Sequence, residues 1–155
     1  MAVQMELSRI FIREMTDMQI IELSEVEGDR TFPIVIGLPE AFAIERRLKG
    51  VQIERPQTHD LLAAVIDALG GELRHIVVND LSDGTFFAKL IIRQGDRDIE
   101  IDSRPSDAIA LAVAGDAGIF VEEHVLEQTA QDSSAAAADA DDETDDDELE
   151  DFNWD

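Results

Sequence analysis

The feature that most constrains this chain is a sharp change in composition near Gln131. Residues 132–155 hold 12 acidic side chains and no basic one, together with a run of four alanines. Dense like charge in a segment of low complexity does not supply the apolar surface that folding requires. We therefore predict a folded domain over residues 1–131 and a disordered acidic tail over residues 132–155.

The composition of the remaining chain fits one domain of ordinary size. The 155 residues are 45% hydrophobic and include no cysteine, which excludes disulfides, thiol nucleophiles and thiolate zinc sites. No secretory signal and no run of about 18 apolar residues is visible, so we expect a cytoplasmic protein that does not cross a membrane. Residues 1–131 carry 24 acidic and 12 basic side chains, a charge that argues against general affinity for nucleic acid.

Short apolar stretches separated by turn residues follow the order strand, strand, strand, helix, and this order occurs twice. A shift in the alternation near Ser8 indicates a bulge in the first strand. The predicted elements of the first half are strands over 3–12, 18–23 and 31–36, a helix that begins near Pro39 and ends at Gly50, an extended piece over 51–56, and a helix with Thr58 as N-cap. Those of the second half are strands over 73–78, 85–93 and 98–103, a helix from Pro105 to Ala114, a strand over 119–121, and a last helical turn near Val125.

The two halves are faintly similar at an offset of 67 residues. The segment 40–44 then falls on 107–111, and Ile34 falls on Ile101. Chance similarity between two apolar helices is the alternative explanation. We favour a duplicated β-β-β-α unit, which predicts an α+β fold with a mixed β-sheet and packed helices.

The densest polar cluster surrounds the start of the helix at Pro105. Ser106 and Asp107 fall in its first turn, where free N–H groups and the helix dipole favour anions. This segment could bind a phosphate, or place the carboxylates of Asp102 and Asp107 around a metal ion. Alternatively, Ser106 and Asp107 are ordinary residues for a helix start, and Arg104 pairs with Asp102.

A second polar cluster covers residues 55–60 and includes the start of another helix. His59 can act as a base near neutral pH, and a neighbouring acid could orient it. Adjacent residues do not share a helix face, so His59 and Asp60 alone do not form a dyad. The alternative is a surface or capping histidine.

Three spaced motifs resemble one known family, the bifunctional nuclease domain family. They are the run 102–112, the run 32–37 followed by Glu40, Ala41 and Ile44, and the run 55–61. The resemblance covers residues 3–126, nearly all of the predicted domain. It implies an α+β domain that is often a homodimer, found in bacteria and plants, with nuclease activity on DNA and RNA.

The resemblance supplies no catalytic mechanism, so the roles below are hypotheses from chemistry. Phosphodiester hydrolysis commonly uses a metal ion, and carboxylates can hold Mg²⁺ or Mn²⁺. Under the duplication, Glu40 and Asp107 are equivalent positions and could face each other. The candidate residues are His59, Asp60, Asp102 and Asp107 for catalysis, Arg55, Arg104 and Ser106 for substrate binding, and Glu40, Asp102 and Asp107 for the metal.

Two functions remain open on the sequence. One is a metal-assisted nuclease that cleaves DNA or RNA, with a local patch of arginines that could include Arg46, Arg47, Arg55 and Arg104. The other is a non-catalytic module that binds a small ligand or a protein. Its acidic tail could dock into a protein partner through Leu149, Phe152 and Trp154. A third idea is that the tail mimics nucleic acid and blocks the domain's own arginine patch.

Overall fold

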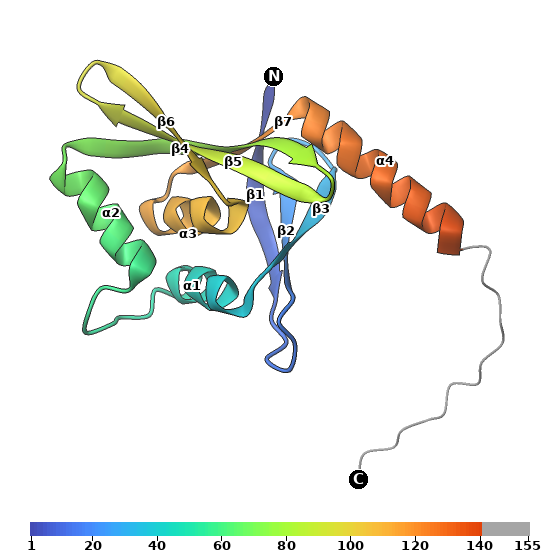
Figure 1. Ribbon diagram of the computed structural model, residues 1–155, viewed down its shortest axis with the longest axis horizontal. Coiled ribbons are helices and arrows are strands. Elements are labelled where there is room, and N and C mark those ends of the chain that lie inside the picture. Colours follow the sequence, from blue (N-terminus) through green and yellow to red (C-terminus); the bar gives the residue numbers. More distant parts are fainter. Residues whose placement is uncertain (141–155) are drawn as a thin grey trace, which may run out of the picture.

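The computed structural model describes residues 1–140, which form one mixed sheet and four helices (Figure 1). The predicted α+β class is confirmed. The strands are β1 (Ala2–Phe11), β2 (Gln19–Glu25), β3 (Thr31–Ile36), β4 (Gly71–Ser82), β5 (Thr85–Gln94), β6 (Arg97–Ser103) and β7 (Gly118–Glu122). The helices are α1 (Leu38–Lys49), α2 (Thr58–Ala68), α3 (Pro105–Gly115) and α4 (Glu123–Ala140).

The sheet consists of two antiparallel meanders joined by one strand. Its order is β3-β2-β1-β7-β4-β5-β6. Strand β7 pairs antiparallel with β1 and parallel with β4, and all other pairs are antiparallel. The element order β-β-β-α therefore occurs twice, as the duplication predicts, and β7 holds the two copies in one sheet.

The strand register reflects the local sequence pattern. The pairing of β1 with β2 shifts between Leu7 and Arg9, where the alternation predicts a bulge. Strand β4 is longer than predicted and runs to Ser82, because a second register shift between Val78 and Asp80 lets pairing with β5 continue. The turn that follows uses Asp83 and Gly84, both with positive φ, as a tight hairpin requires.

Helices α1 and α3 begin with the same local chemistry. Each has a proline in its first two positions, and neither has a side-chain cap. The two helices contact each other, and Figure 1 shows both of them on the same side of strands β4, β5 and β6. Helix α3 is the more central, with Ala108, Ile109, Ala110 and Ala112 fully buried.

Helices α2 and α4 differ more from their predictions. Gln57 rather than Thr58 is the N-cap of α2, and its side chain and that of Asp60 form a capping box. Residues 51–57 form no strand. Helix α4 is much longer than the single turn predicted near Val125 and continues to Ala140, past the boundary at Gln131. The rest of the predicted tail, including Leu149, Phe152 and Trp154, lies outside the described residues.

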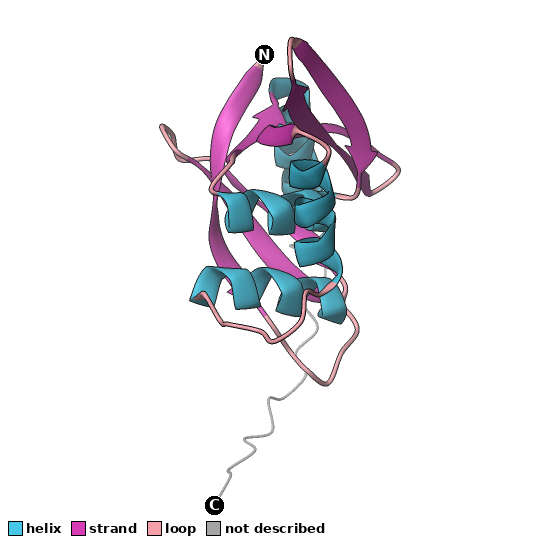
Figure 2. Cartoon of the chain, turned by 90° about the vertical axis from the view of Figure 1, so that its left-hand side faces the viewer, coloured by secondary structure: helices cyan, strands magenta, loops and turns pink. Residues whose placement is uncertain are grey.

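The core forms one aliphatic cluster between the sheet and the helices, with both meanders, α1, α3 and the start of α4 contributing to it. Phe32 of β3 stacks on Phe86 of β5 with ring centroids 5.6 Å apart, which joins the two halves across the core. Figure 2 shows the helices grouped beside the strands. None of the helices in the described part of the chain combines the length and apolar character that a membrane crossing requires.

Candidate functional site

One guanidinium joins the equivalent acids of the two halves. Glu40 and Asp107 both occupy the third position of their helices, α1 and α3. Arg104 Nε donates to Asp107 Oδ2 at 2.8 Å, and its Nη2 donates to Asp107 Oδ1 at 3.1 Å and to Glu40 Oε1 at 3.2 Å. The expectation that Glu40 and Asp107 lie close together is therefore met, with Arg104 between them.

His59 reaches the same carboxylate from a third helix. It lies in the first turn of α2, and its Nε2 is 2.8 Å from Asp107 Oδ1. Its side chain is only 12% exposed, whereas that of Arg104 is 65% exposed. The sequence places these two residues in separate motifs, and the fold brings them onto one aspartate.

The environment keeps Asp107 ionised. Burial acts to raise the pKa of this carboxyl, but hydrogen bonds from Arg104 and His59 outweigh burial and hold the pKa below its ordinary value. An ionised Asp107 can accept an N–H of the imidazole and fix the orientation of the ring. The three side chains therefore form an oriented histidine next to an exposed guanidinium.

Asp60 belongs to a different polar group. Its Oδ1 accepts from Arg47 at 2.9 Å, and its Oδ2 accepts from Arg46 at 3.0 Å and from the Gln57 backbone N–H at 2.9 Å. Burial acts to raise the pKa of Asp60, but these partners together lower it. Both oxygens are engaged in fastening α2 to α1, so the predicted catalytic role of Asp60 gains no support from the geometry.

Asp102 lies on the opposite side of the sheet from this cluster. It pairs across strands with Lys89, which alternates with the buried residues Ala88 and Leu90. Cross-strand partners project from the same face, so Asp102 points away from the core into which α3 packs. The alternation of apolar and polar residues in β6 already indicates that Asp102 faces away from the core. The structure does not bring Asp102 to Asp107.

The remaining predicted substrate-binding residues also separate. Arg55 is exposed in the loop before α2 and forms no side-chain hydrogen bond or ion pair with the described residues. Ser106 is only 6% exposed and lines a cleft of about 510 Å³ together with Arg104. Of these residues, Arg104 and Ser106 are adjacent to the cluster.

The residues do not fit a divalent metal ion in this arrangement. Within the described residues, no group of three or more His, Asp or Glu side chains is placed to hold one. Arg104 already occupies both oxygens of Asp107 and one oxygen of Glu40, and Asp102 lies on the other side of the sheet. The structure therefore supports no step through Mg²⁺ or Mn²⁺, and the metal stays a prediction.

Sequence reasoning missed two contacts that shape this region. The first is the pairing of Asp60 with Arg46 and Arg47, which no local motif indicates because the partners lie on different helices. The second is a close approach at Gly37, where a Cβ atom would lie 2.2 Å from Glu40 Oε2. The glycine that precedes α1 was the available signal, because it leaves room for the Glu40 carboxylate.

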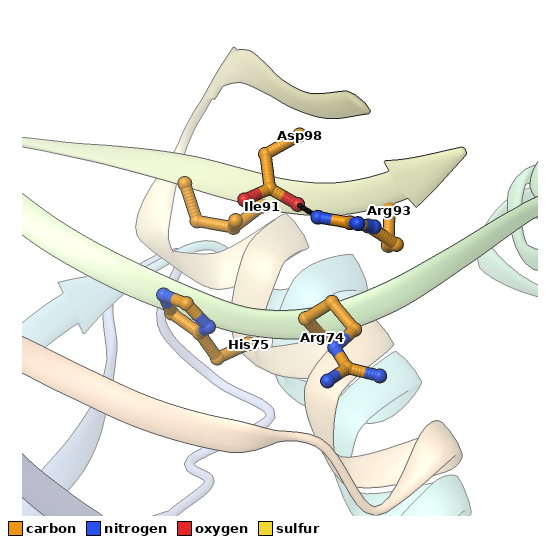
Figure 3. A pocket seen from close by; sticks show the side chains of 5 residues that line it. All are labelled: Arg74, His75, Ile91, Arg93 and Asp98. Atoms are coloured by element: carbon orange, nitrogen blue, oxygen red, sulfur yellow. Dashed lines mark hydrogen bonds and ion pairs between the residues drawn. The ribbon is translucent and has the colours of Figure 1, made fainter. Parts of the chain in front are cut away.

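A separate hollow of about 510 Å³ lies over strands β4, β5 and β6, away from this cluster (Figure 3). Its lining includes Arg74 and His75 from β4, and Figure 3 shows Arg93 joined to Asp98 on the neighbouring strands. The Arg93–Asp98 ion pair spans 3.2 Å. None of the residues around Asp107 lines this hollow, so the two sites are distinct.

The chain is similar to several known proteins. An uncharacterized protein of Mycobacterium tuberculosis strain H37Rv is 43% identical over 119 residues, which are 77% of this chain and 71% of that protein. A protein of strain CDC 1551 matches with the same figures. Bifunctional nuclease 2 of Arabidopsis thaliana is 31% identical over 84 residues, which are 52% of this chain and 26% of the plant protein.

A family comparison covers most of the described structure. The bifunctional nuclease domain model matches residues 21–134, a span that includes α1, α2, α3 and therefore Glu40, His59, Arg104 and Asp107. The resemblance seen in the three sequence motifs is confirmed. The chain belongs to the bifunctional nuclease domain family.

Proposed function

We propose that this protein is a nuclease that hydrolyses phosphodiester bonds of DNA or RNA, with His59, Asp107 and Arg104 as its central residues. The observation that carries the proposal is the shared carboxylate of Asp107. It lies 2.8 Å from His59 Nε2 and is held on its other side by Arg104 Nε, also at 2.8 Å. A base oriented by an acid can activate a water molecule, and an exposed cation beside it can stabilise the charge on a phosphodiester.

The residues divide the reaction between them. When the Nε2–H group of His59 donates a hydrogen bond to Asp107, Nδ1 is the unprotonated nitrogen of the imidazole. Nδ1 then takes a proton from the attacking water. The water oxygen forms a bond to phosphorus, the bond to the leaving ester oxygen breaks, and the proton returns to that oxygen. Arg104 stabilises the charge that gathers on the phosphoryl oxygens.

The test is cleavage of single-stranded and double-stranded DNA and RNA by the purified full chain. We expect His59→Gln and Asp107→Asn to lower the rate by about 100-fold or more, the usual size of a general acid–base contribution. His124→Gln is the matched control, because His124 is 57% exposed and lies in α4, where Asp80 rather than Asp107 is its acidic neighbour. Equal cleavage by all four proteins, each shown to be folded, would contradict the assignment and indicate a contaminating nuclease.

A second arm of the assay addresses the metal. The sequence predicts assistance by Mg²⁺ or Mn²⁺, whereas the arrangement of Glu40, Arg104 and Asp107 leaves no carboxylate oxygen pair free for such an ion. Cleavage that persists in a chelator favours catalysis by His59, Asp107 and Arg104 without a metal ion. Cleavage that requires added metal would mean that Arg104 leaves the two acids before the reaction.

A non-catalytic binding module is the second candidate function. The observation that favours it is the internal pairing of the cluster, because Glu40, His59, Arg104 and Asp107 together fasten α1, α2 and α3. A folded wild-type protein that cleaves none of the four substrates would support this candidate. Binding of a protein partner by the acidic tail and formation of a homodimer stay predictions, which pull-down with tail peptides and sedimentation velocity would test.

A further inference from the structure

A cleft beside Arg104 is lined in part by the first turn of α3, including Ser106. It lies between the end of β3, the start of β5 and the first turn of α3, and has a volume of about 510 Å³. Its lining includes Ser106, which is only 6% exposed and whose hydroxyl forms no hydrogen bond with the described residues. The hydroxyl is not one of the fully buried unpaired atoms of the described residues, so it remains accessible and can donate to a molecule in the cleft.

The backbone around Ser106 supplies further donors. The first hydrogen bond of α3 runs from the Ala108 N–H to the Arg104 carbonyl at 3.1 Å, so the N–H groups of Ser106 and Asp107 have no helical partner. No side chain caps this end of the helix. Its partial positive charge and its free N–H groups favour an anion.

The start of α1 differs in this respect, although Gly37 lines the same cleft. There the Glu40 carboxylate folds back over Gly37 and places its own negative charge at the end of the helix. The equivalent carboxylate of Asp107 is instead engaged by Arg104 and His59. The start of α3 is therefore the end that remains open to an external anion.

Arg104 contributes a free donor as well. Its Nε and Nη2 contact Asp107 and Glu40, while Nη1 has no partner among the described residues, and the side chain is 65% exposed. Two carboxylates on one guanidinium leave a net negative charge on this side of the cleft. A doubly charged phosphate would be repelled more strongly than a singly charged one.

The other walls of the cleft suit an organic substituent. Met18, Pro33 and Phe86 line it opposite the polar first turn of α3. A volume of about 510 Å³ is within the range of small-molecule sites and exceeds what a bare phosphate fills. The lining therefore combines anion donors with an apolar surface for a sugar or base. It also includes the carboxylate of Asp17, which further disfavours a doubly charged phosphate.

We propose that this cleft binds a singly charged nucleotide phosphodiester, with Ser106 Oγ, the N–H groups of Ser106 and Asp107, and Arg104 Nη1 as the donors to its phosphate. The inference rests on the proposed nuclease function, for which it places the substrate phosphate beside Asp107. For Ser106, already a candidate for substrate binding on the sequence, it specifies the role of a hydroxyl donor to the phosphate. It also adds a selection for internal phosphodiesters over terminal phosphates, which carry close to two charges at neutral pH.

The test is a titration of the full chain, in a chelator, with three probes that differ in charge: the dinucleotide TpT, thymidine 5′-monophosphate and thymidine. We expect TpT to bind most tightly and to shift the amide NMR signals of Ser106 and Asp107. Ser106→Ala should weaken TpT binding by about tenfold, the effect of one hydrogen bond to a charged group. Ser24→Ala, a serine on β2 that lies outside the cleft lining, is the matched control.

Each outcome decides the proposal. Unchanged TpT affinity in folded Ser106→Ala, no shift at Ser106 in the wild type, or equal binding of thymidine 5′-monophosphate would overturn it. The wild-type NMR arm keeps the test valid if the variant does not fold. An eight-nucleotide strand in a parallel titration distinguishes sources, because tighter binding than TpT points to nucleic acid and equal binding to a small dinucleotide.

The two proposals can fail separately. If His59 and Asp107 variants lose cleavage while Ser106→Ala binds TpT normally, the nuclease assignment stands and the cleft assignment fails. If TpT binds at Ser106 but no substrate is cleaved, the cleft stands as the site of a binding module.

Discussion

Each of the two β-β-β-α halves places an acid at the third position of its helix, Glu40 in α1 and Asp107 in α3. Only Asp107 has several polar side chains around it. Asp107 receives His59 and two donors of Arg104, whereas Glu40 receives a single bond from Arg104. The residue before the helix makes the difference. Arg104 precedes α3 and reaches both acids, while Gly37 precedes α1 and only makes room for Glu40.

The segments that follow these helices differ in the same way. In the first half, residues 51–57 form a loop and α2 has no buried residue. In the second half, β7 has two neighbouring strands and α4 buries Val125 and Leu126. Helix α2 therefore depends on its polar contacts, with Ile66 alone among its residues packed against the core, whereas α4 depends on apolar burial. The segments that follow the two β-β-β-α units are thus held by different forces.

The largest expected effect is on the polar attachment of α2. Asp60→Asn removes the charge that pairs with Arg46 and Arg47, and the Arg47 side chain is only 4% exposed. Because a nearly buried guanidinium then lacks its counterion, we expect a loss of about 3 kcal/mol in the free energy of unfolding. Urea denaturation would measure it. Asp67→Asn on the exposed side of the same helix is the control. A change below about 0.5 kcal/mol in both variants would show that the pairing of Asp60 with Arg46 and Arg47 does not hold α2 in place.

Next comes the acid of the second half. Asp107→Asn weakens the contacts to both Arg104 and His59, and we expect a loss of about 2 kcal/mol, since hydrogen bonds between charged groups contribute more than neutral ones. Asp116→Asn is a suitable control, because it lies at the other end of α3 in a left-handed conformation that asparagine also adopts. Equal stability of the two variants would contradict the view that Asp107 fastens His59 of α2 to the start of α3.

The pH dependence of stability sharpens the same point. The folded-state pKa of Asp107 lies below its ordinary value of 3.8, so its stabilising contribution is fully present above that pH and is lost as the pH falls through the lowered pKa. The difference in unfolding free energy between wild type and Asp107→Asn should therefore shrink as the pH falls below 3.8. Urea titrations from pH 3.8 down to strongly acidic pH would show this, and a difference that grows over that range would have the wrong sign.

Local patterns were enough to predict much of this arrangement. The order of strands and helices along the chain, the bulge near Ser8, and the equivalence of Glu40 with Asp107 all follow from alternation, turn residues and an internal repeat. The attachment of Asp60 to Arg46 and Arg47 could not be predicted, because it joins two helices whose packing depends on the whole fold. The placement of β7 between β1 and β4 and the length of α4 are likewise tertiary effects.

A smaller effect is expected for the acid of the first half. Glu40→Gln removes one charge from a bond of 3.2 Å to a guanidinium that is 65% exposed and keeps Asp107 as its partner. We expect a loss of about 0.5–1 kcal/mol, within the range of exposed ion pairs. Denaturation beside Glu45→Gln, whose Lys49 pair is also on α1, provides the reference. A loss as large as that of Asp107→Asn would mean that the two halves contribute equally.

The smallest effect concerns Gly37 itself. Its backbone is extended with φ −75°, which alanine can adopt, but the added Cβ would lie 2.2 Å from Glu40 Oε2 and must displace that carboxylate. Displacement weakens the Glu40–Arg104 bond, while alanine also reduces the entropy of the unfolded chain, so the two terms offset and Gly37→Ala should change stability by less than about 0.5 kcal/mol.

The informative quantity is the coupling between Gly37→Ala and Glu40→Gln. If Gly37 serves to seat Glu40 on Arg104, Glu40→Gln should cost nothing further in the Gly37→Ala protein, and the cost should persist in a Gly115→Ala background, where an added Cβ meets no atom within 4 Å. Full additivity in both backgrounds would show that the glycine does not set the position of the acid, and the contrast between the two helix starts would then rest on Arg104 alone.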